Sequence, residues 1–103
     1  MRVEIRHTVD CPNWEQAGRQ LRLALIATGH ADEDIVSREI RTPEDAARFP
    51  YAGSPTMTLD GLDLFPQADP VGDLACRLYA TPRGLAGFPT LDQLSDAVAA
   101  RWK

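Results

Sequence analysis

The residues best suited to chemistry in this chain are its two cysteines, Cys11 and Cys76. Cys11 lies in the run VDCPNW (residues 9–14), between a strand-like segment and a helix-like one. A thiol at a helix N-cap faces unpaired backbone N–H groups and the positive end of the helix dipole, which lower a cysteine pKa from about 8.5 toward about 3.5–7.5. Pro12 at the first helical position favours that geometry. The pattern therefore predicts a reactive thiolate at Cys11.

Two neighbours of Cys11 bear on this prediction. Asp10 opposes ionisation of the thiol if its carboxylate turns toward the sulfur. Position 14, where a C-x-x-C motif carries its second cysteine, holds Trp14. The alternative interpretation is that Cys11 is a small buried residue at a tight corner. We favour the reactive interpretation, because reactive cysteines are found at partly exposed helix starts.

Cys76 is the candidate partner of Cys11. If the two sulfurs meet, Cys76 resolves a sulfenic acid or a mixed disulfide on Cys11, or the two thiolates hold a soft metal ion such as Cu(I), Zn or Hg(II). Arg77 would favour the thiolate form of Cys76. A disulfide needs Cα atoms within about 7 Å, which the sequence leaves open. The alternative is that Cys76 is buried in a short helix.

Three ring side chains are further candidates for a site. Trp14 begins an apolar helical stripe and so packs in the core, or it forms an aromatic wall beside the thiol that contacts an apolar ligand. His7 shares a strand face with apolar residues, and His30 follows a helix end, so neither forms a metal motif. The chain has no P-loop, dinucleotide fingerprint or serine nucleophile elbow, which leaves phosphate, nicotinamide and acyl chemistry without support.

Composition limits the class of protein. A chain of 103 residues, 44% hydrophobic and 25% charged, suits one small domain over residues 1–103. A net charge of −4 without a basic block argues against nucleic acid as a partner. Residues 1–10 alternate charged and apolar side chains, so we expect no secretory signal and no membrane partner, and we predict a cytoplasmic protein.

Periodicity predicts the elements of the first half. Alternation over residues 2–9 and 34–41 predicts two strands. Apolar residues at helical spacing predict a helix of about four turns from Pro12 to Gly29. A hydroxyl N-cap at Thr42, followed by a proline and two acidic residues, predicts a short second helix.

The second half combines a hairpin, a loop and a helix. Asp60-Gly61 joins two alternating runs over residues 56–65 and favours a type I′ hairpin. Residues 66–89 are rich in proline and glycine, and we predict a loop around a short ordered piece at 74–79. Thr90 with Gln93 forms a capping box that opens the last helix.

The order strand, helix, strand, helix, hairpin, helix predicts an α/β fold of the thioredoxin type. Such a fold has a central mixed four-stranded sheet with helices on both faces. The end of the first strand and the start of the first helix form its chemical corner. Cys11 lies at that corner.

The sequence resembles the thioredoxin superfamily across nearly its whole length, with Cys11 at the nucleophile position and GSPT (residues 53–56) before the hairpin. The resemblance implies that Pro55 is a cis-proline facing the thiol. More narrowly, the runs CPNW, GSPT, CRLY and GLAG are similar to a group of small bacterial thioredoxin-like proteins. Some members are labelled alkylmercury lyase-like, and we do not transfer that label. Because Trp14 replaces the second cysteine of the family motif, standard disulfide reductase activity is not expected.

These residues support three hypotheses. The first is thiol–disulfide redox chemistry without a cofactor, in which Cys11 attacks, Cys76 resolves, Pro55 shapes the opposing wall and the partner is a protein or small-molecule thiol or disulfide. The second is a non-enzymatic soft-metal or mercury-handling protein, in which Cys11 and Cys76 coordinate the ion. The third is a redox-inactive binding module that uses Trp14 and the groove around it. The candidate binding residues are Trp14, Ser54 and Arg77.

Overall fold

The computed structural model describes residues 2–9, 11, 13–48, 53–66 and 77–102. Predictions on Asp10, Pro12, Cys76 and the ordered piece before residue 77 lie outside these residues. The protein is an α/β structure whose elements follow in the order β1 (Val3–His7), α1 (Trp14–Ala27), β2 (Ile35–Glu39), α2 (Pro43–Arg48), β3 (Thr56–Leu59), β4 (Leu62–Asp63), β5 (Tyr79–Thr81), β6 (Gly84–Ala86) and α3 (Leu91–Arg101).

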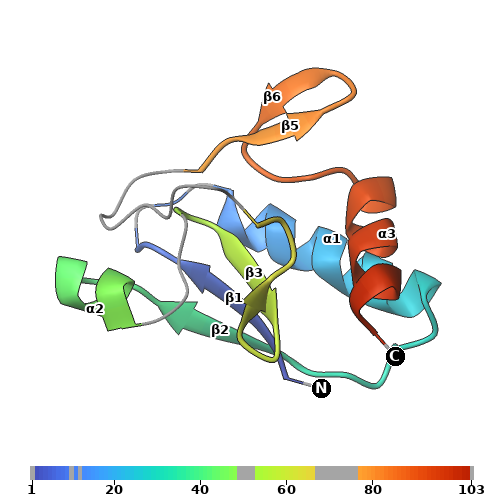
Figure 1. Ribbon diagram of the computed structural model, residues 1–103, viewed down its shortest axis with the longest axis horizontal. Helices are drawn as coiled ribbons and strands as arrows, with labels where there is room; N and C mark the ends of the chain where they lie inside the picture. Colours follow the sequence, from blue (N-terminus) through green and yellow to red (C-terminus); the bar gives the residue numbers. More distant parts are fainter. Residues whose placement is uncertain (1, 10, 12, 49–52, 67–76, 103) are drawn as a thin grey trace.

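The central element is a mixed sheet of four strands in the order β2-β1-β3-β4 (Figure 1). β1 and β2 run parallel, with Val3 opposite Ile35. β3 runs antiparallel to β1, and β4 runs antiparallel to β3. A parallel pair needs a crossover, which α1 supplies. The prediction of a mixed four-stranded sheet is confirmed.

The turn between β3 and β4 has the geometry that its sequence predicts. Asp60 has a φ of 50° and Gly61 a φ of 82°, and a type I′ turn requires positive φ at both central residues. The Asp60 carboxylate also accepts a hydrogen bond of 2.7 Å from the backbone N–H of Arg2. The turn is thereby held against the start of β1.

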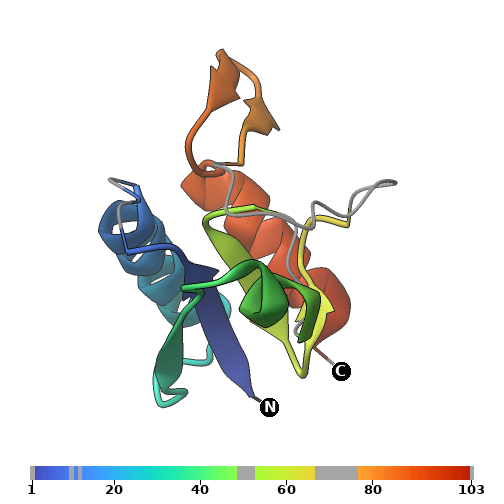
Figure 2. The same ribbon diagram turned by 90° about the vertical axis from the view of Figure 1, so that its left-hand side faces the viewer.

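Helices α1 and α3 lie side by side on one face of the sheet (Figure 2). Between them and the strands lies one apolar core, because β1 and the helices turn their periodic apolar side chains inward. Helix α2 lies beyond the C-terminal end of β2 (Figure 1), where Ala46 packs with Ile40. The core residues are Val3, Ile5, Ala17, Leu21, Ala24, Leu25, Met57, Leu59, Leu64, Tyr79, Leu94 and Val98.

Both ends of α3 are fixed by side chains. Thr90 accepts a hydrogen bond from the Gln93 N–H at 3.1 Å, and the Gln93 amide oxygen accepts one from the Thr90 N–H at 2.9 Å. The predicted capping box is confirmed. After the last turn, the Trp102 ring stacks on His30 with 3.7 Å between ring centroids. This contact joins the end of α3 to the end of α1.

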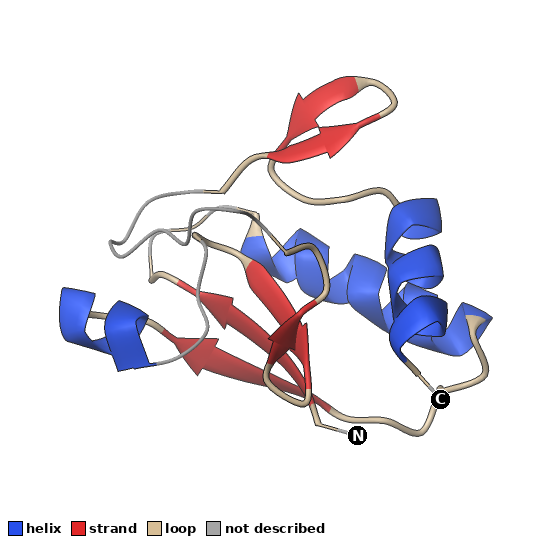
Figure 3. Ribbon diagram, in the orientation of Figure 1, coloured by secondary structure: helices blue, strands red, loops and turns tan. Residues whose placement is uncertain are grey.

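The prediction that the segment up to residue 89 is mostly loop is wrong for its last part. Strands β5 and β6 form a hairpin that stands apart from the four-stranded sheet (Figure 3). Each strand has three residues, too few for a period-two pattern to show. Tertiary contacts fix its position instead: the Tyr79 hydroxyl donates to the Pro55 carbonyl, and the Tyr79 ring meets Phe65 edge-on at 5.5 Å.

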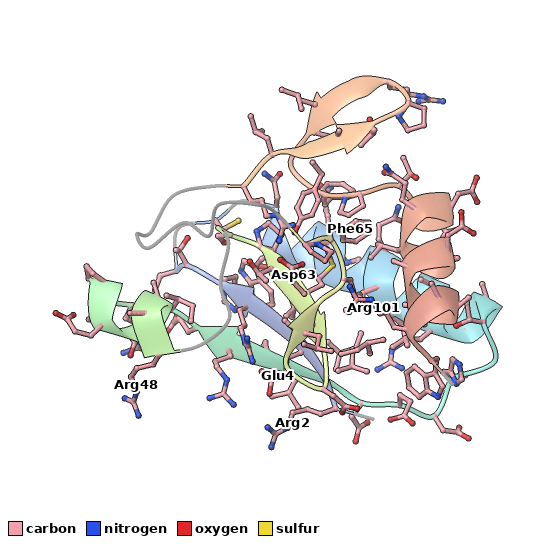
Figure 4. The ribbon with its side chains drawn as sticks, in the orientation of Figure 1. Arg2, Glu4, Arg48, Asp63, Phe65 and Arg101 are labelled. Carbon is pink, nitrogen blue, oxygen red and sulfur yellow. The ribbon has the colours of Figure 1, made fainter. Side chains whose placement is uncertain are left out.

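The other face of β1 carries a buried ion pair. Glu4 is 1% exposed, and it accepts hydrogen bonds from Arg6 at 2.9 Å and from Arg38 of β2 at 3.4 Å. Arg2 also approaches it at 3.5 Å (Figure 4). Burial by itself raises the pKa of Glu4, but the hydrogen bonds and charges of Arg6 and Arg38 outweigh it. The pKa of Glu4 therefore lies below its usual value.

None of the helices in the described part of the chain is both long enough and apolar enough to cross a bilayer.

Replacing Glu4 with glutamine is expected to lower the free energy of unfolding at pH 7 by about 3 kcal/mol, because the buried ion pair between Glu4 and Arg6 is broken. The pKa of Glu4 is lowered in the folded state. The stabilisation is therefore complete above the reference pKa of 4.5 and is lost as the pH falls through the folded-state pKa. Urea unfolding followed by circular dichroism at a series of pH values measures both effects.

The matched control is Glu44→Gln in the exposed first turn of α2, which should change stability by less than about 1 kcal/mol. An unchanged acid-dependent loss of stability in Glu4→Gln would show that Glu4 is not its source.

Candidate functional site

Cys11 lies in the connection between β1 and α1, as predicted. It is a free thiol, 5% exposed, and its backbone N–H donates to the Thr8 carbonyl at 3.4 Å. The prediction that Cys11 is the helix N-cap is wrong. Asn13 is the N-cap, and its carbonyl accepts the helical hydrogen bond from Ala17. Cys11 therefore precedes the cap by two residues, and its burial agrees with the alternative interpretation of a small residue at a tight corner.

The segment Ser54-Pro55 lies beside the end of β1. The Ser54 hydroxyl accepts a hydrogen bond of 3.0 Å from the Thr8 N–H. Since the Thr8 carbonyl accepts from Cys11, one residue links the Cys11 connection to the Ser54-Pro55 segment. The Ser54–Pro55 peptide bond is cis, the geometry that the resemblance implies. Both side chains are buried, and the wall-shaping role of Pro55 stays a prediction.

Arg77 joins the segment before β5 to β4. Its guanidinium forms an ion pair with Asp63 at 2.9 Å and donates to the Phe65 carbonyl. It also lies over the Tyr79 ring, 4.4 Å from the centroid. Arg77 is 3% exposed, and only its Nε lacks a hydrogen-bond partner among the described residues. These contacts hold the Arg77 guanidinium against β4 and the Tyr79 ring.

Gly53 is required where the Ser54-Pro55 segment meets Arg77. Its φ of 107° lies in a region that side chains disfavour. A Cβ on Gly53 would also lie 2.9 Å from the Cβ of Arg77. The Arg77 N–H donates to the Ser54 carbonyl at 2.9 Å beside this contact. The glycine of the GSPT run therefore permits the two segments to approach closely.

Trp14 stacks on His7, with 3.9 Å between ring centroids and an interplanar angle of 3°. Sequence reasoning treated His7 as a strand residue and missed this pairing. The sequence signal for this stacking is Trp14, an aromatic residue at the start of the helix that follows the strand ending at His7. The Nδ1 atom of His7 lies 2.9 Å from the Thr8 carbonyl, and because a carbonyl oxygen only accepts, Nδ1 is the donor in this hydrogen bond.

An apolar groove of about 680 Å³ runs along α1 and β2, with Trp14 at one end. The lining includes residues of the edge strand β2, and a binding role for the groove stays a prediction. Its lining comprises Ile5, Trp14, Glu15, Gly18, Arg19, Arg22, Leu23, Ile35 and Ser37.

The structure thus joins Cys11, Ser54 and Pro55 through Thr8, joins Trp14 to His7, and directs Arg77 toward Asp63. Among the residues that the structure describes, no three histidine, cysteine or acidic side chains gather as a metal site requires. The soft-metal hypothesis depends on Cys76, which lies outside the described residues.

Comparisons with protein-family models, with curated proteins and with solved structures gave no significant match.

Replacing Gly53 with alanine is expected to lower the free energy of unfolding by more than about 2 kcal/mol, because backbone strain and the contact with Arg77 add. Gly84→Ala is the matched control: its φ is 108°, but its added Cβ would have no neighbour within 4 Å in the described part of the chain. Chemical denaturation of both variants separates strain from steric contact, and equal losses would exclude the Arg77 contact as a cause.

Proposed function

We propose that this chain is a thioredoxin-like domain and that Cys11 takes part in thiol–disulfide exchange. The element order and the strand order β2-β1-β3-β4 support the fold, since they combine a parallel crossover pair with an antiparallel hairpin. Two of the features that carry the resemblance are Cys11 and the GSPT run. Hydrogen bonds through Thr8 link Cys11 to Ser54 of that run.

The observation that carries the proposal is the position of Cys11. It follows the C-terminal end of β1, and Thr8 links it by two hydrogen bonds to Ser54, the residue before Pro55. In open α/β sheets, ligands bind outside the carboxyl ends of the strands. Cys11 therefore lies at the end of the sheet where α/β proteins commonly bind their ligands.

The exchange needs no cofactor. The Cys11 thiolate attacks one sulfur of a substrate disulfide, a mixed disulfide forms, and the other substrate sulfur leaves as a thiolate. The Cys76 thiolate then attacks the Cys11 sulfur and releases the first substrate sulfur. The substrate is reduced by two electrons, and the cysteine pair is oxidised to a disulfide.

Reaction with an aromatic disulfide reagent such as 5,5′-dithiobis(2-nitrobenzoic acid) tests this sequence. We expect the native chain to release two aromatic thiolates and gain a Cys11–Cys76 disulfide by mass spectrometry. Cys76→Ser is expected to stop at the mixed disulfide on Cys11, with one thiolate released. Cys11→Ser is the matched control for reaction at Cys76 alone. If Cys11 stays unmodified in the folded protein but reacts in urea, the proposal fails.

A second candidate is a redox-inactive binding module, which the burial of Cys11 and the groove beside Trp14 favour. Iodoacetamide at neutral pH distinguishes the two candidates. Modification of folded Cys11 faster than a free cysteine peptide supports exchange, whereas modification only on unfolding supports the binding module.

A further inference from the structure

The sheet has an open edge at β2. Among the described strands, β2 pairs only with β1, so one side of its backbone has no strand partner (Figure 1). Val36 in this strand is 47% exposed. Sheet edges with free N–H and C=O groups are templates for pairing with another chain. β2 is therefore able to extend the sheet outward.

The helix above this edge carries a glycine that the single chain does not explain. Gly18 lies in the interior of α1, and no atom of the described residues lies within 4 Å of where its Cβ would be. Glycine inside a helix costs about 1 kcal/mol relative to alanine. No contact within the described residues requires that cost. Gly18 lines the groove, so close approach of another molecule along the groove would account for a glycine at this position.

Charges on the groove side of α1 are ordered along the helix. Glu15 stands near its start, and Arg19 and Arg22 follow. Arg22 donates to the Ala31 and Glu33 carbonyls. Arg19 is exposed and makes no hydrogen bond or ion pair with a described residue. An antiparallel copy of the same helix reverses this order, so it brings an acidic side chain against each basic pair.

We propose that a second copy of this chain docks along β2 and the groove, related by a two-fold axis. The two β2 strands pair antiparallel, and the two α1 helices lie antiparallel above them. Glu15 of each copy then faces Arg19 and Arg22 of the other, and the Trp14 end of each groove faces the Leu23 end of the other. A two-fold interface uses the same patch on both copies, and this patch is complementary to itself.

Apolar burial and strand pairing supply the affinity, and the charges set the orientation. Leu23 lines the groove and is 47% exposed in the single chain, and covering such apolar side chains is the main source of association energy. Exposed ion pairs contribute at most about 1 kcal/mol each, but juxtaposed like charges suppress wrong arrangements. An unrelated extended peptide would pair with the same strand edge, but it would not present the matching charges that a second copy presents.

The dimer deepens the binding-module candidate, since it names the occupant of the groove beside Trp14. It does not depend on chemistry at Cys11. If the disulfide or iodoacetamide experiments show no reaction at Cys11, the dimer proposal is unaffected. If the chain does not dimerise, the proposal of thiol exchange is unaffected.

Sedimentation equilibrium over a range of protein concentrations tests the dimer. We expect the mass to rise from 11.3 kDa to twice that value. Gly18→Gln fills the groove with a good helix former, so it should abolish the dimer while keeping or raising the melting temperature. Ala99→Gln on the exposed side of α3 is the matched control and should dimerise like the native chain. A native chain that stays monomeric at every concentration overturns the proposal.

Charge reversal tests the arrangement of the two copies. Glu15→Arg and Arg19→Glu should each raise the dissociation constant at least about tenfold, because like charges then meet across the interface. The double variant with both substitutions should recover most of the native affinity. If the double variant is as weak as the single variants, the antiparallel arrangement is wrong.

Discussion

β1 is buried on both faces, and the rest of the structure is arranged around that constraint. One face contributes Val3 and Ile5 to the core under α1 and α3. The other face carries Glu4 and Arg6, also buried. Because a buried charge is costly unless it is paired, Glu4 must receive Arg6 and Arg38, which ties the neighbouring strand β2 to β1. The central strand is thus held by hydrophobic packing on one side and by a charge network on the other.

The position of β1 also determines the position of the segment after it. Thr8 uses its N–H to hold Ser54 and its carbonyl to hold the Cys11 backbone. Gly53 then allows Arg77 to pack against the same segment, and Arg77 reaches Asp63 on β4. Segments from both halves of the sequence therefore meet at the end of one strand. Thiol chemistry at Cys11 would operate within a rigid, hydrogen-bonded setting, and the low exposure of Cys11 makes access the deciding factor.

The edge of the sheet has a different character from its centre. Helix α1 covers β1, and a groove lies between α1 and β2 with Gly18 in its lining. The same helix therefore has two roles: its buried side builds the core, and its outer side presents apolar and charged residues in an order that complements itself. Thiol exchange and self-association would use separate parts of the molecule. Trp14, which stacks on His7, lies in the lining of the groove and connects the two.

The sequence by itself determined the features whose causes are local. Asp60-Gly61 set the hairpin because its backbone preferences suit the turn, and Thr90 with Gln93 set the start of α3 because the two residues satisfy each other. Features that depend on distant partners needed the tertiary structure. The β5–β6 hairpin is positioned by Tyr79 against Pro55, and the stacking of His7 on Trp14 joins a strand to a helix. The burial of Cys11 and its position ahead of the helix N-cap also needed the tertiary structure. The exposure of a side chain in the β1–α1 connection is decided by the segments that pack around it, and not by the residues of the connection itself.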